Sequence, residues 1–245
     1  MVRGWQRLGP NERIKAWADA ALPLAKAALA ATSDPLRCGG TWAVGLDLLP
    51  NDQTGAVGGV DLPWADLGLV REPLHRAQLS TIHPGYPQPS TEESASAYAF
   101  RLNRDAAHLD GLLPIGPDRH RMVKEPHAWI LGLPLNVSDA SPLVVWEGSH
   151  LILQAALREA FAPHKPEKWG DVDVTQVYTI ARRRIFDTCP RIPLQVRPGE
   201  ATLLHRLTLH GVAPWVPSAT APPEGRIIAY FRPLMSSVND WLTQP

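Results

Sequence analysis

Cysteine is scarce in this 245-residue sequence, and net charge is absent. The two cysteines, Cys38 and Cys189, are far apart and belong to no CxxC or Cys/His cluster, so the sequence indicates neither a disulfide framework nor a structural zinc site. Lys and Arg total 24, and Asp and Glu also total 24. Because these charges cancel, no overall electrostatic field would draw the chain onto nucleic acid or an anionic membrane. We therefore expect neither as a partner and expect a small-molecule ligand instead.

Long apolar runs are missing as well. No stretch approaches the ~18 consecutive apolar residues that cross a bilayer. The opening segment MVRGWQRLGPNERIKAW lacks the apolar core of a signal peptide. We therefore expect a soluble, cytoplasmic protein, whose oligomeric state the sequence leaves open.

The chain does contain the material for a packed core and for many turns. Apolar residues make up 44% of it, and nine of them are Trp, which places the composition far from the disordered range. The 25 prolines are spread over the whole chain, a pattern that favours turns and long loops around a sheet scaffold. The length suits one larger β or mixed domain, and we expect a single domain over residues 1–245.

The first 96 residues are predicted to form an N-terminal layer of helix and loops. Apolar residues recur near helical spacing over 11–31, where Pro23 is expected to kink or divide the helix. The rest of this region is rich in Gly, Pro and Asp, and TWAVGLDLL is its one convincing strand. Most of it is therefore expected to be loop.

Residues 97–233 are predicted to form a jelly-roll core. Short apolar or alternating runs recur there between turn residues, which is typical of a sandwich or jelly roll. Two helix-like pieces, LILQAALREAF and VTQVYTIARRRIF, the second with Asp173 as its expected cap, would form an insertion over 151–187. The fold class is thus mainly β with flanking helices, a cupin-like double-stranded β-helix. The expected strands are AYAFRLN, AWILGLPLNV, PLVVW, ATLLHRLTL and RIIAYF.

Three side chains in this core are candidate metal ligands. His108 and Asp110 lie two residues apart just after AYAFRLN, and residues at that spacing on an extended chain point to one side. An isolated His-x-acid pair is expected by chance in a chain of this size. The strand ATLLHRLTL, however, ends in His210, which precedes the turn residue Gly211. Two His and one carboxylate leave one face of an iron open for cosubstrate and oxygen, although zinc accepts the same ligands.

Arg226 favours iron chemistry over zinc. It begins the strand RIIAYF, 16 residues beyond His210. A guanidinium stays charged when partly buried and binds a carboxylate through two parallel hydrogen bonds. Arg226 is therefore a candidate for the far carboxylate of 2-oxoglutarate.

Together the segments HLD, AWILGLPLNVSDASPLVVWEGSH, GEATLLHRLTLHGVAPW and GRIIAYF resemble the phytanoyl-CoA dioxygenase family of iron and 2-oxoglutarate oxygenases, over roughly residues 97–233. The resemblance implies that His108, Asp110 and His210 bind Fe(II), that Arg226 holds the cosubstrate and that Trp129 packs against it. It further implies a dioxygenase that uses O2 to hydroxylate a small organic substrate and releases succinate and CO2. Related halogenases replace the carboxylate with a small residue, so Asp110 favours hydroxylation over halogenation.

Two alternatives stay open. The chain could be a non-catalytic jelly-roll protein that binds a metal or ligand, because one fold hosts many functions. It could also be a zinc hydrolase, which would give Arg226 and Trp129 no role. His205 is expected on the opposite face of its strand from His210, and the run Arg182–Arg184 is read as a solvated helix face rather than a binding site for an acidic substrate.

Overall fold

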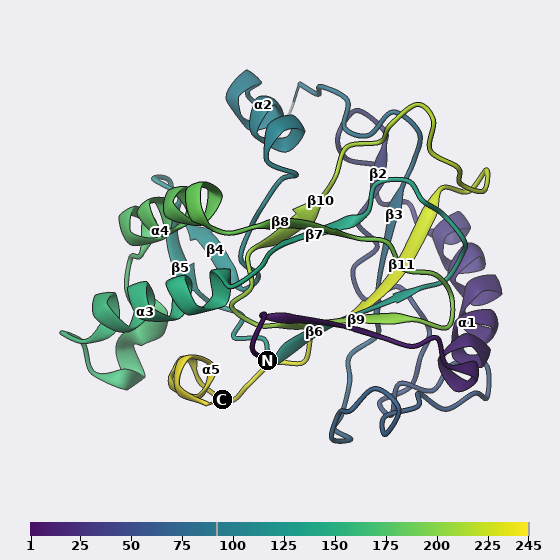
Figure 1. Cartoon of the computed structure of the whole chain (residues 1–245), viewed down its shortest axis with the longest axis horizontal. Helices are drawn as coiled ribbons and strands as arrows, with labels where there is room; N and C mark the ends of the chain where they lie inside the picture. The colour runs from purple at the N-terminus through teal and green to yellow at the C-terminus, as the bar shows by residue number, and fades with distance from the viewer. Residues whose placement is uncertain (92, 245) are drawn as a thin grey trace.

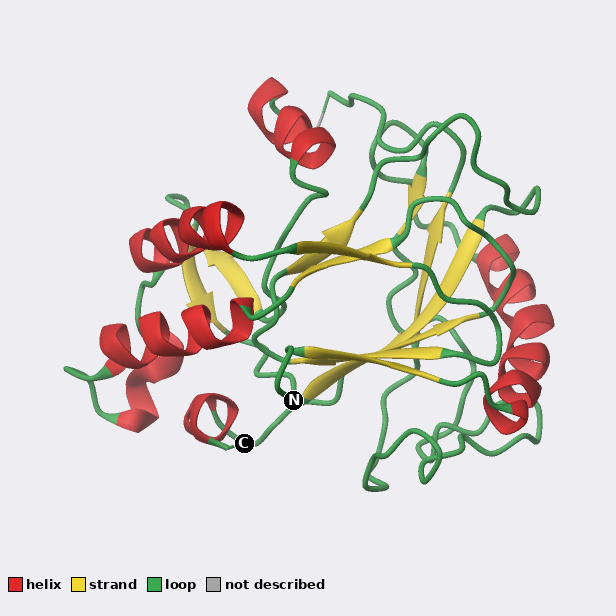
Figure 2. Cartoon of the chain, in the orientation of Figure 1, coloured by secondary structure: helices red, strands yellow, loops and turns green. Residues whose placement is uncertain are grey.

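A computed structural model describes residues 1–91 and 93–244 of the chain. Two antiparallel sheets pack face to face, and helices cover both ends of the sandwich (Figures 1 and 2). The larger sheet has the strand order β1-β9-β6-β11-β3-β2. Its strands are β1 (Trp5–Leu8), β2 (Trp42–Ala43), β3 (Gln78–Ile82), β6 (Trp129–Pro134), β9 (Ala201–His205) and β11 (Arg226–Phe231).

The smaller sheet has the order β10-β7-β8, with strands β7 (Leu143–Trp146), β8 (Arg191–Leu194) and β10 (His210–Val212). After β6 the chain forms β7 and β8 of the smaller sheet, returns to the larger sheet with β9, and then places β10 in the smaller sheet and β11 in the larger one. Apolar side chains from both sheets meet between them, where Ile130 and Leu204 of the larger sheet pack with Val145 and Leu194 of the smaller one. This contact defines the inner face of each sheet.

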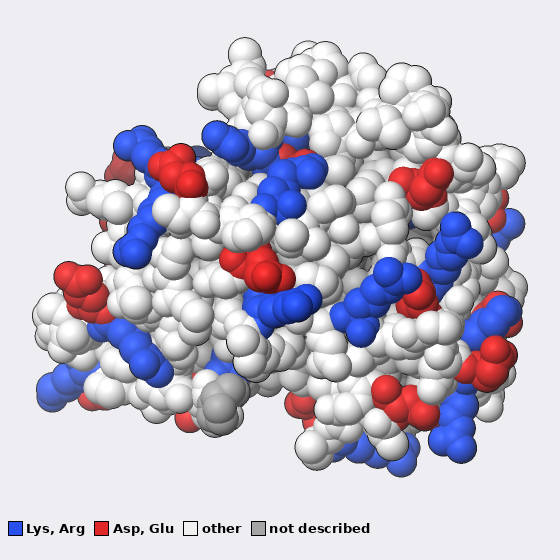
Figure 3. All heavy atoms as spheres, viewed as in Figure 1, with Lys and Arg blue, Asp and Glu red and all other residues white. Residues whose placement is uncertain are grey.

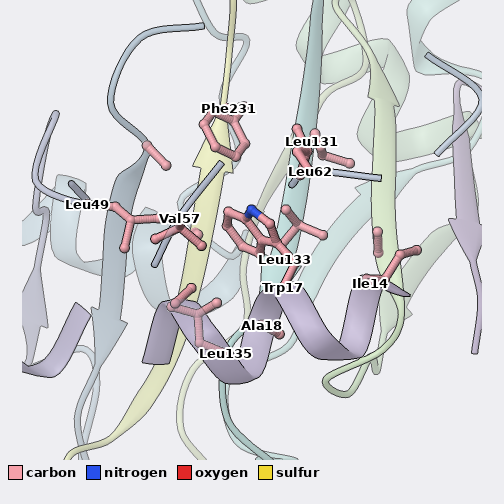
Figure 4. Close-up of a cluster of buried hydrophobic side chains, with 14 of the residues drawn as sticks. Ile14, Trp17, Ala18, Leu49, Val57, Leu62, Leu131, Leu133, Leu135 and Phe231 are labelled. Carbon is pink, nitrogen blue, oxygen red and sulfur yellow. The ribbon is translucent and has the colours of Figure 1, made fainter. Parts of the chain in front are cut away.

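The outer face of the larger sheet is covered by helix α1 (Glu12–Ala31). The side chain of Asn11 accepts hydrogen bonds from two N–H groups of the first turn and so caps the helix. Trp17 is fully buried against Phe231 and Leu133 of the sheet (Figure 4). The helix is not divided at Pro23, because Trp17 on one side of the proline and Ala25 on the other are both anchored in the same apolar cluster.

A second apolar cluster holds the helical end of the molecule together. It joins the inserted helices to the hairpin of β4 and β5 and to the C-terminal helix, and its largest buried side chains include Phe161 and Trp241. The two helices expected within 151–187 are present. The elements are β4 (Leu112–Ile115), β5 (His120–Val123), α3 (Ser149–Phe161), the 3-10 helix η1 (Pro166–Asp171), α4 (Thr175–Thr188) and α5 (Val238–Thr243).

Several strands differ from their predictions. AYAFRLN is not a strand but part of helix α2 (Ala95–Asn103), whose first turn is capped by Ser94 and whose Phe100 packs on Phe186 of α4. ATLLHRLTL is one strand only as far as His205. The chain then turns, and His210 begins β10 in the other sheet instead of ending the same strand.

None of the described helices is long and apolar enough to cross a membrane. On the face shown in Figure 3, basic and acidic side chains are interspersed, and neither sign forms a continuous field. This agrees with a net charge of zero.

Candidate metal centre

The backbone itself brings the two candidate histidines together. His108 and His210 form an isolated antiparallel bridge, in which each N–H donates to the other's carbonyl oxygen at N···O distances of 2.8 and 3.1 Å. Directly opposed residues of an antiparallel pair point to the same side, and the two imidazole rings lie 4.6 Å apart between centroids. His210 also pairs with Val145, an inner-face residue, so its ring is directed between the sheets.

Asp110 completes the cluster, as the sequence predicted. One nitrogen from each histidine and one oxygen of Asp110 all lie within 4.8 Å of one another. The Nε2 atoms of His108 and His210 are 3.2 and 3.8 Å from Oδ1 of Asp110. These three side chains therefore present their donor atoms to one point.

The tautomer of both histidines suits a metal ligand. Nδ1 of His108 donates to the carbonyl oxygen of Ala106 at 3.0 Å, and Nδ1 of His210 donates to that of Thr208 at 2.9 Å. A carbonyl can only accept, so Nδ1 carries the proton and Nε2 is the atom left for a metal.

The pKa values of the three side chains are shifted by burial and by their interactions with one another. Burial raises the pKa of Asp110, but the interactions of its carboxylate with His210, His108 and the Arg232 guanidinium outweigh burial and hold that pKa well below its usual range. Burial lowers the pKa of His108, yet its hydrogen bond to Asp110 leaves it above the ordinary value. Burial lowers the pKa of His210 to about 4. A carboxylate and a neutral imidazole are the protonation states that bind a divalent cation.

Arg232 holds the outer oxygen of Asp110 and was missed by the sequence analysis. Its Nη1 donates to Oδ2 of Asp110 at 3.2 Å, and its Nη2 donates to Oε1 of Gln78 at 2.6 Å. The inner oxygen, Oδ1, stays directed at the histidines. The signal that could have found Arg232 is its place directly after β11, six residues beyond Arg226, because an even spacing along an extended chain directs two side chains to the same side.

Two glycines next to the ligands allow this close packing. A Cβ on Gly211 would lie 2.1 Å from the carbonyl oxygen of Asp105, and one on Gly111 would lie 2.0 Å from that of Glu125. Neither approach is open to a larger residue. Asp105 is itself fixed by two hydrogen bonds from Arg191, both 2.7 Å long, so the loop that carries His108 is tied to β8.

The segment Gly148-Ser149-His150 fixes the backbone next to His210. Ser149 is fully buried, and its Oγ accepts a 2.9 Å hydrogen bond from the backbone N–H of Leu209. His150 does not reach the cluster, because its ring lies 5.0 Å from that of His205 on the outer side of the larger sheet. His205 ends β9 in the larger sheet, whereas His210 begins β10 in the smaller one, so the two histidines do not share a strand and the predicted opposite faces of one strand do not apply.

Arg226 lies on the inner face of β11 and is 5% exposed. Its neighbours Ile227 and Ala229 belong to the outer cluster under α1, so alternation directs Arg226 between the sheets. Its Nη1 is buried with no hydrogen-bond partner among the described residues. An unpaired buried guanidinium N–H is costly, and a carboxylate would satisfy it. The adjoining cleft measures about 10 Å³, so a dicarboxylate can enter only if side chains there move.

Trp129 does not join the site. It faces outward on β6, its indole N–H donates to Glu72 at 3.0 Å, and its ring packs edge-on against Trp64 at 6.5 Å. The expected packing against a cosubstrate is a wrong assignment in this structure, because alternation turns Ile130, and not Trp129, toward the space between the sheets.

One wall of a cleft of about 560 Å³ includes His108. The His108 side chain is 53% exposed, whereas those of Asp110 and His210 are 8% and 7% exposed. The metal centre is thus buried on two sides and opens to the cleft on the third. This is the arrangement in which a small molecule can reach a bound metal without exposing its other ligands.

The triad of His108, Asp110 and His210 fits a divalent metal, and Arg226 fits the carboxylate of a bound molecule. Two imidazoles whose Nε2 atoms are directed at one ionised carboxylate form the two-histidine, one-carboxylate donor set of non-haem ferrous oxygenases. The Nη1 atom of Arg226, buried without a partner between the sheets, is the matching observation for the carboxylate of 2-oxoglutarate.

Comparison with known proteins places the fold. No family model matches the sequence, and no curated protein matches it. The solved structure of the non-haem alpha-ketoglutarate-dependent carbocyclase SnoK from nogalamycin biosynthesis superposes with a TM-score of 0.51 at 11% identity, over 98% of this chain and 85% of that one. The chain therefore has a fold found among non-haem 2-oxoglutarate-dependent enzymes, combined with a His-Asp-His triad.

Two further structures have lower scores and support no argument of their own. AviO1 from Streptomyces viridochromogenes Tue57 has a TM-score of 0.41 at 16% identity, covering 96% of this chain and 91% of its own. EctD from S. alaskensis, solved with 2-oxoglutarate and 5-hydroxyectoine, has a TM-score of 0.41 at 16% identity, covering 94% and 72%. At these identities a likeness concerns the fold, and the chemistry must be judged from the site.

Proposed function

We propose that this chain is a single-domain, Fe(II)- and 2-oxoglutarate-dependent dioxygenase that hydroxylates a small organic molecule, with succinate and CO2 as coproducts. The observation that carries the proposal is the convergence of the two Nε2 atoms and the Asp110 carboxylate within 4.8 Å, with both Nδ1 protons fixed by backbone carbonyls. The sandwich of two antiparallel sheets supports its interpretation as a double-stranded β-helix.

Each residue has a defined task in this proposal. His108, Asp110 and His210 would hold iron, and Arg232 keeps the carboxylate of Asp110 turned toward the histidines. Arg226 would bind the far carboxylate of 2-oxoglutarate through its free N–H groups. Iron with 2-oxoglutarate supplies the ability to activate oxygen and oxidise a C–H bond. The apolar side chains between the sheets exclude water from the cosubstrate end of the site.

Hydroxylation is proposed over halogenation because position 110 carries a carboxylate, which takes the place that a halide would need. A zinc hydrolase would use the same three ligands. It would leave the buried guanidinium of Arg226 without a partner and without a task, so the oxygenase explains more of the site.

The test is uncoupled turnover by the full chain. Apoprotein is loaded with Fe(II) under anaerobic conditions and then given 2-oxoglutarate and oxygen, and succinate is measured by mass spectrometry. We expect succinate formation that requires both iron and 2-oxoglutarate and is lost in Asp110→Ala. Binding of iron and 2-oxoglutarate without any succinate, over a panel of small organic acids and alcohols, would favour a non-catalytic binding protein instead.

A further inference from the structure

The cleft beside His108 carries a local excess of positive charge in a chain with no net charge. Its walls include three arginines, Arg101, Arg121 and Arg182, and one glutamate, Glu93. Three positive charges against one negative leave an excess of two. Helices α2 and α4, which contact each other through Phe100 and Phe186, both contribute residues to this cleft. Both helices lie away from α1 (Figure 1).

The three arginines are not equivalent. Arg101 is already neutralised, because its Nε and Nη2 donate to Oε1 of Glu93 at 3.1 and 2.8 Å. Arg121 and Arg182 form no ion pair with any carboxylate in the described part of the chain. Nη1 of Arg121 donates only to the carbonyl oxygen of Leu112, at 3.3 Å. Two guanidinium groups therefore face the cleft with their charges uncompensated.

Arg182 is held in place by aromatic rings instead of by an acid. Its guanidinium carbon lies 4.6 Å from the ring centroid of Phe100 and 5.2 Å from that of Tyr178. Contacts of this kind orient a guanidinium and leave its N–H groups free. Arg183 and Arg184, the next residues on α4, are exposed, whereas Arg182 is half-buried. Arg183 and Arg184 therefore face solvent, as the sequence predicts, whereas Arg182 lines the cleft.

Tyr178 connects these cations to the metal ligands. It is 6% exposed, its ring packs under the Arg182 guanidinium, and burial raises the pKa of its hydroxyl group while Arg182 and the backbone of Leu109 act to lower it. Leu109 is the residue between His108 and Asp110. A molecule bound at Arg182 would therefore lie in the same cleft as His108. Only Tyr178 and Leu109 would separate it from the triad.

We propose that this cleft binds the substrate as an organic anion, with a carboxylate or phosphate group held between Arg121 and Arg182 and the rest of the molecule extended along the apolar wall toward His108. This inference rests on the proposed function, since it names the class of substrate for the same metal centre. The apolar wall is formed by Phe100, Leu112, Ile82 and Val212. The volume of about 560 Å³ suits a small molecule.

The test measures where simple anions bind. The full chain is loaded with Mn(II), saturated with 2-oxoglutarate, and titrated with 4-fluorobenzoate, 4-fluorophenyl phosphate or the neutral 4-fluorobenzyl alcohol, while fluorine relaxation is recorded by NMR. We expect at least one anion to bind about ten-fold or more tightly than the alcohol. Its fluorine should also relax faster with Mn(II) than without. Comparison of the two anions tells whether carboxylate or phosphate is preferred.

Variants assign the binding to the two cations. Arg121→Gln and Arg182→Gln should each weaken anion binding about ten-fold, whereas Arg183→Gln, on the same helix but exposed, should leave it unchanged. Arg182→Lys keeps the charge without the planar fork and should fall between. Thermal unfolding of each variant checks that it is folded. Equal affinity for the alcohol, equal effects of Arg182→Gln and Arg183→Gln, or displacement of the anion by 2-oxoglutarate would each overturn the inference.

Repeating the titration without metal separates this inference from the proposed function. Arginine-dependent anion binding in a chain that fails to bind Mn(II) at the triad would contradict the oxygenase and leave the anion site standing. Binding of Mn(II) and 2-oxoglutarate without any anion binding would leave the oxygenase standing and overturn the anion site.

Discussion

The two faces of the larger sheet have different compositions and different tasks. The outer face is a continuous apolar surface under α1, built from residues such as Leu131, Leu133 and Phe231 (Figure 4). The inner face carries buried polar and charged groups as well, including Arg226 and Gln78. Since successive residues of a strand alternate between faces, one strand serves both purposes. The outer face supplies stability, and the inner face holds the polar groups to which the proposed function gives a role.

The largest expected effect comes from breaking the outer face. Trp17→Ala removes a fully buried ring and its 2.8 Å hydrogen bond to Gly55, and should lower the free energy of unfolding by about 3–5 kcal/mol. Iron affinity of the folded protein should stay the same, because Trp17 is separated from the triad by the sheet. Denaturant unfolding and anaerobic Fe(II) titration measure the two quantities. A matching loss of iron affinity would show that the faces are not independent.

The same comparison predicts the reverse result for Arg226→Ala on the inner face. Removing a buried guanidinium that lacks a partner should leave the stability of the apoprotein unchanged or raised. Affinity for 2-oxoglutarate should fall at least about 30-fold, the effect of removing one partner of a buried charge pair. Calorimetric titration of the Fe(II) protein tests this, with Arg226→Lys as the control that retains the charge. Unaltered 2-oxoglutarate affinity in Arg226→Ala would refute its assignment.

A smaller effect is expected for Arg232, which touches Asp110 rather than the metal. Arg232→Met keeps the length of the side chain and removes its hydrogen bonds to Asp110 and Gln78. Loss of such a supporting contact should weaken metal binding about 10- to 100-fold. The matched control is Gln78→Met, which leaves the contact between Arg232 and Asp110 in place and should have the weaker effect. Competition with a chelator measures both affinities.

The smallest effect is predicted for substitution of Trp129, which tests whether an outer-face residue takes part in cosubstrate binding. Trp129→Phe keeps an aromatic ring on the outer face and should change the free energy of unfolding by less than about 1.5 kcal/mol. Affinity for 2-oxoglutarate should not change, because the indole is directed at Glu72 and Trp64. A clear loss of 2-oxoglutarate affinity would show that Trp129 does contact the cosubstrate.

The three candidate metal ligands could be predicted from sequence because the signals that mark them are local. His108 and Asp110 are two residues apart, and His210 adjoins a glycine that the fold requires. Arg226 could be predicted because it opens a strand whose apolar pattern is clear, and that strand is found at the expected residues.

The rest depends on contacts between distant segments. Trp129 lies on the face of β6 that α1 covers. The sequence near Trp129 does not show which face that is, because α1 comes from a distant part of the chain. The alternation of Tyr98, Phe100 and Leu102 in the sequence predicts a strand. The segment is helix α2 instead, because Ser94 caps its first turn and Phe100 packs on Phe186. The short strands β1, β3 and β8 have no pattern of their own and are stabilised by pairing with their neighbours.

The most direct test of the account is an anaerobic titration of the apoprotein with Fe(II) and then with 2-oxoglutarate, followed by visible absorption. The account predicts a weak charge-transfer band that appears only when both are present, is lost in Asp110→Ala and His210→Ala, and requires more 2-oxoglutarate in Arg226→Ala. Iron binding without this band in the unaltered protein would contradict the assignment of 2-oxoglutarate as cosubstrate and favour a metal-binding protein of another kind.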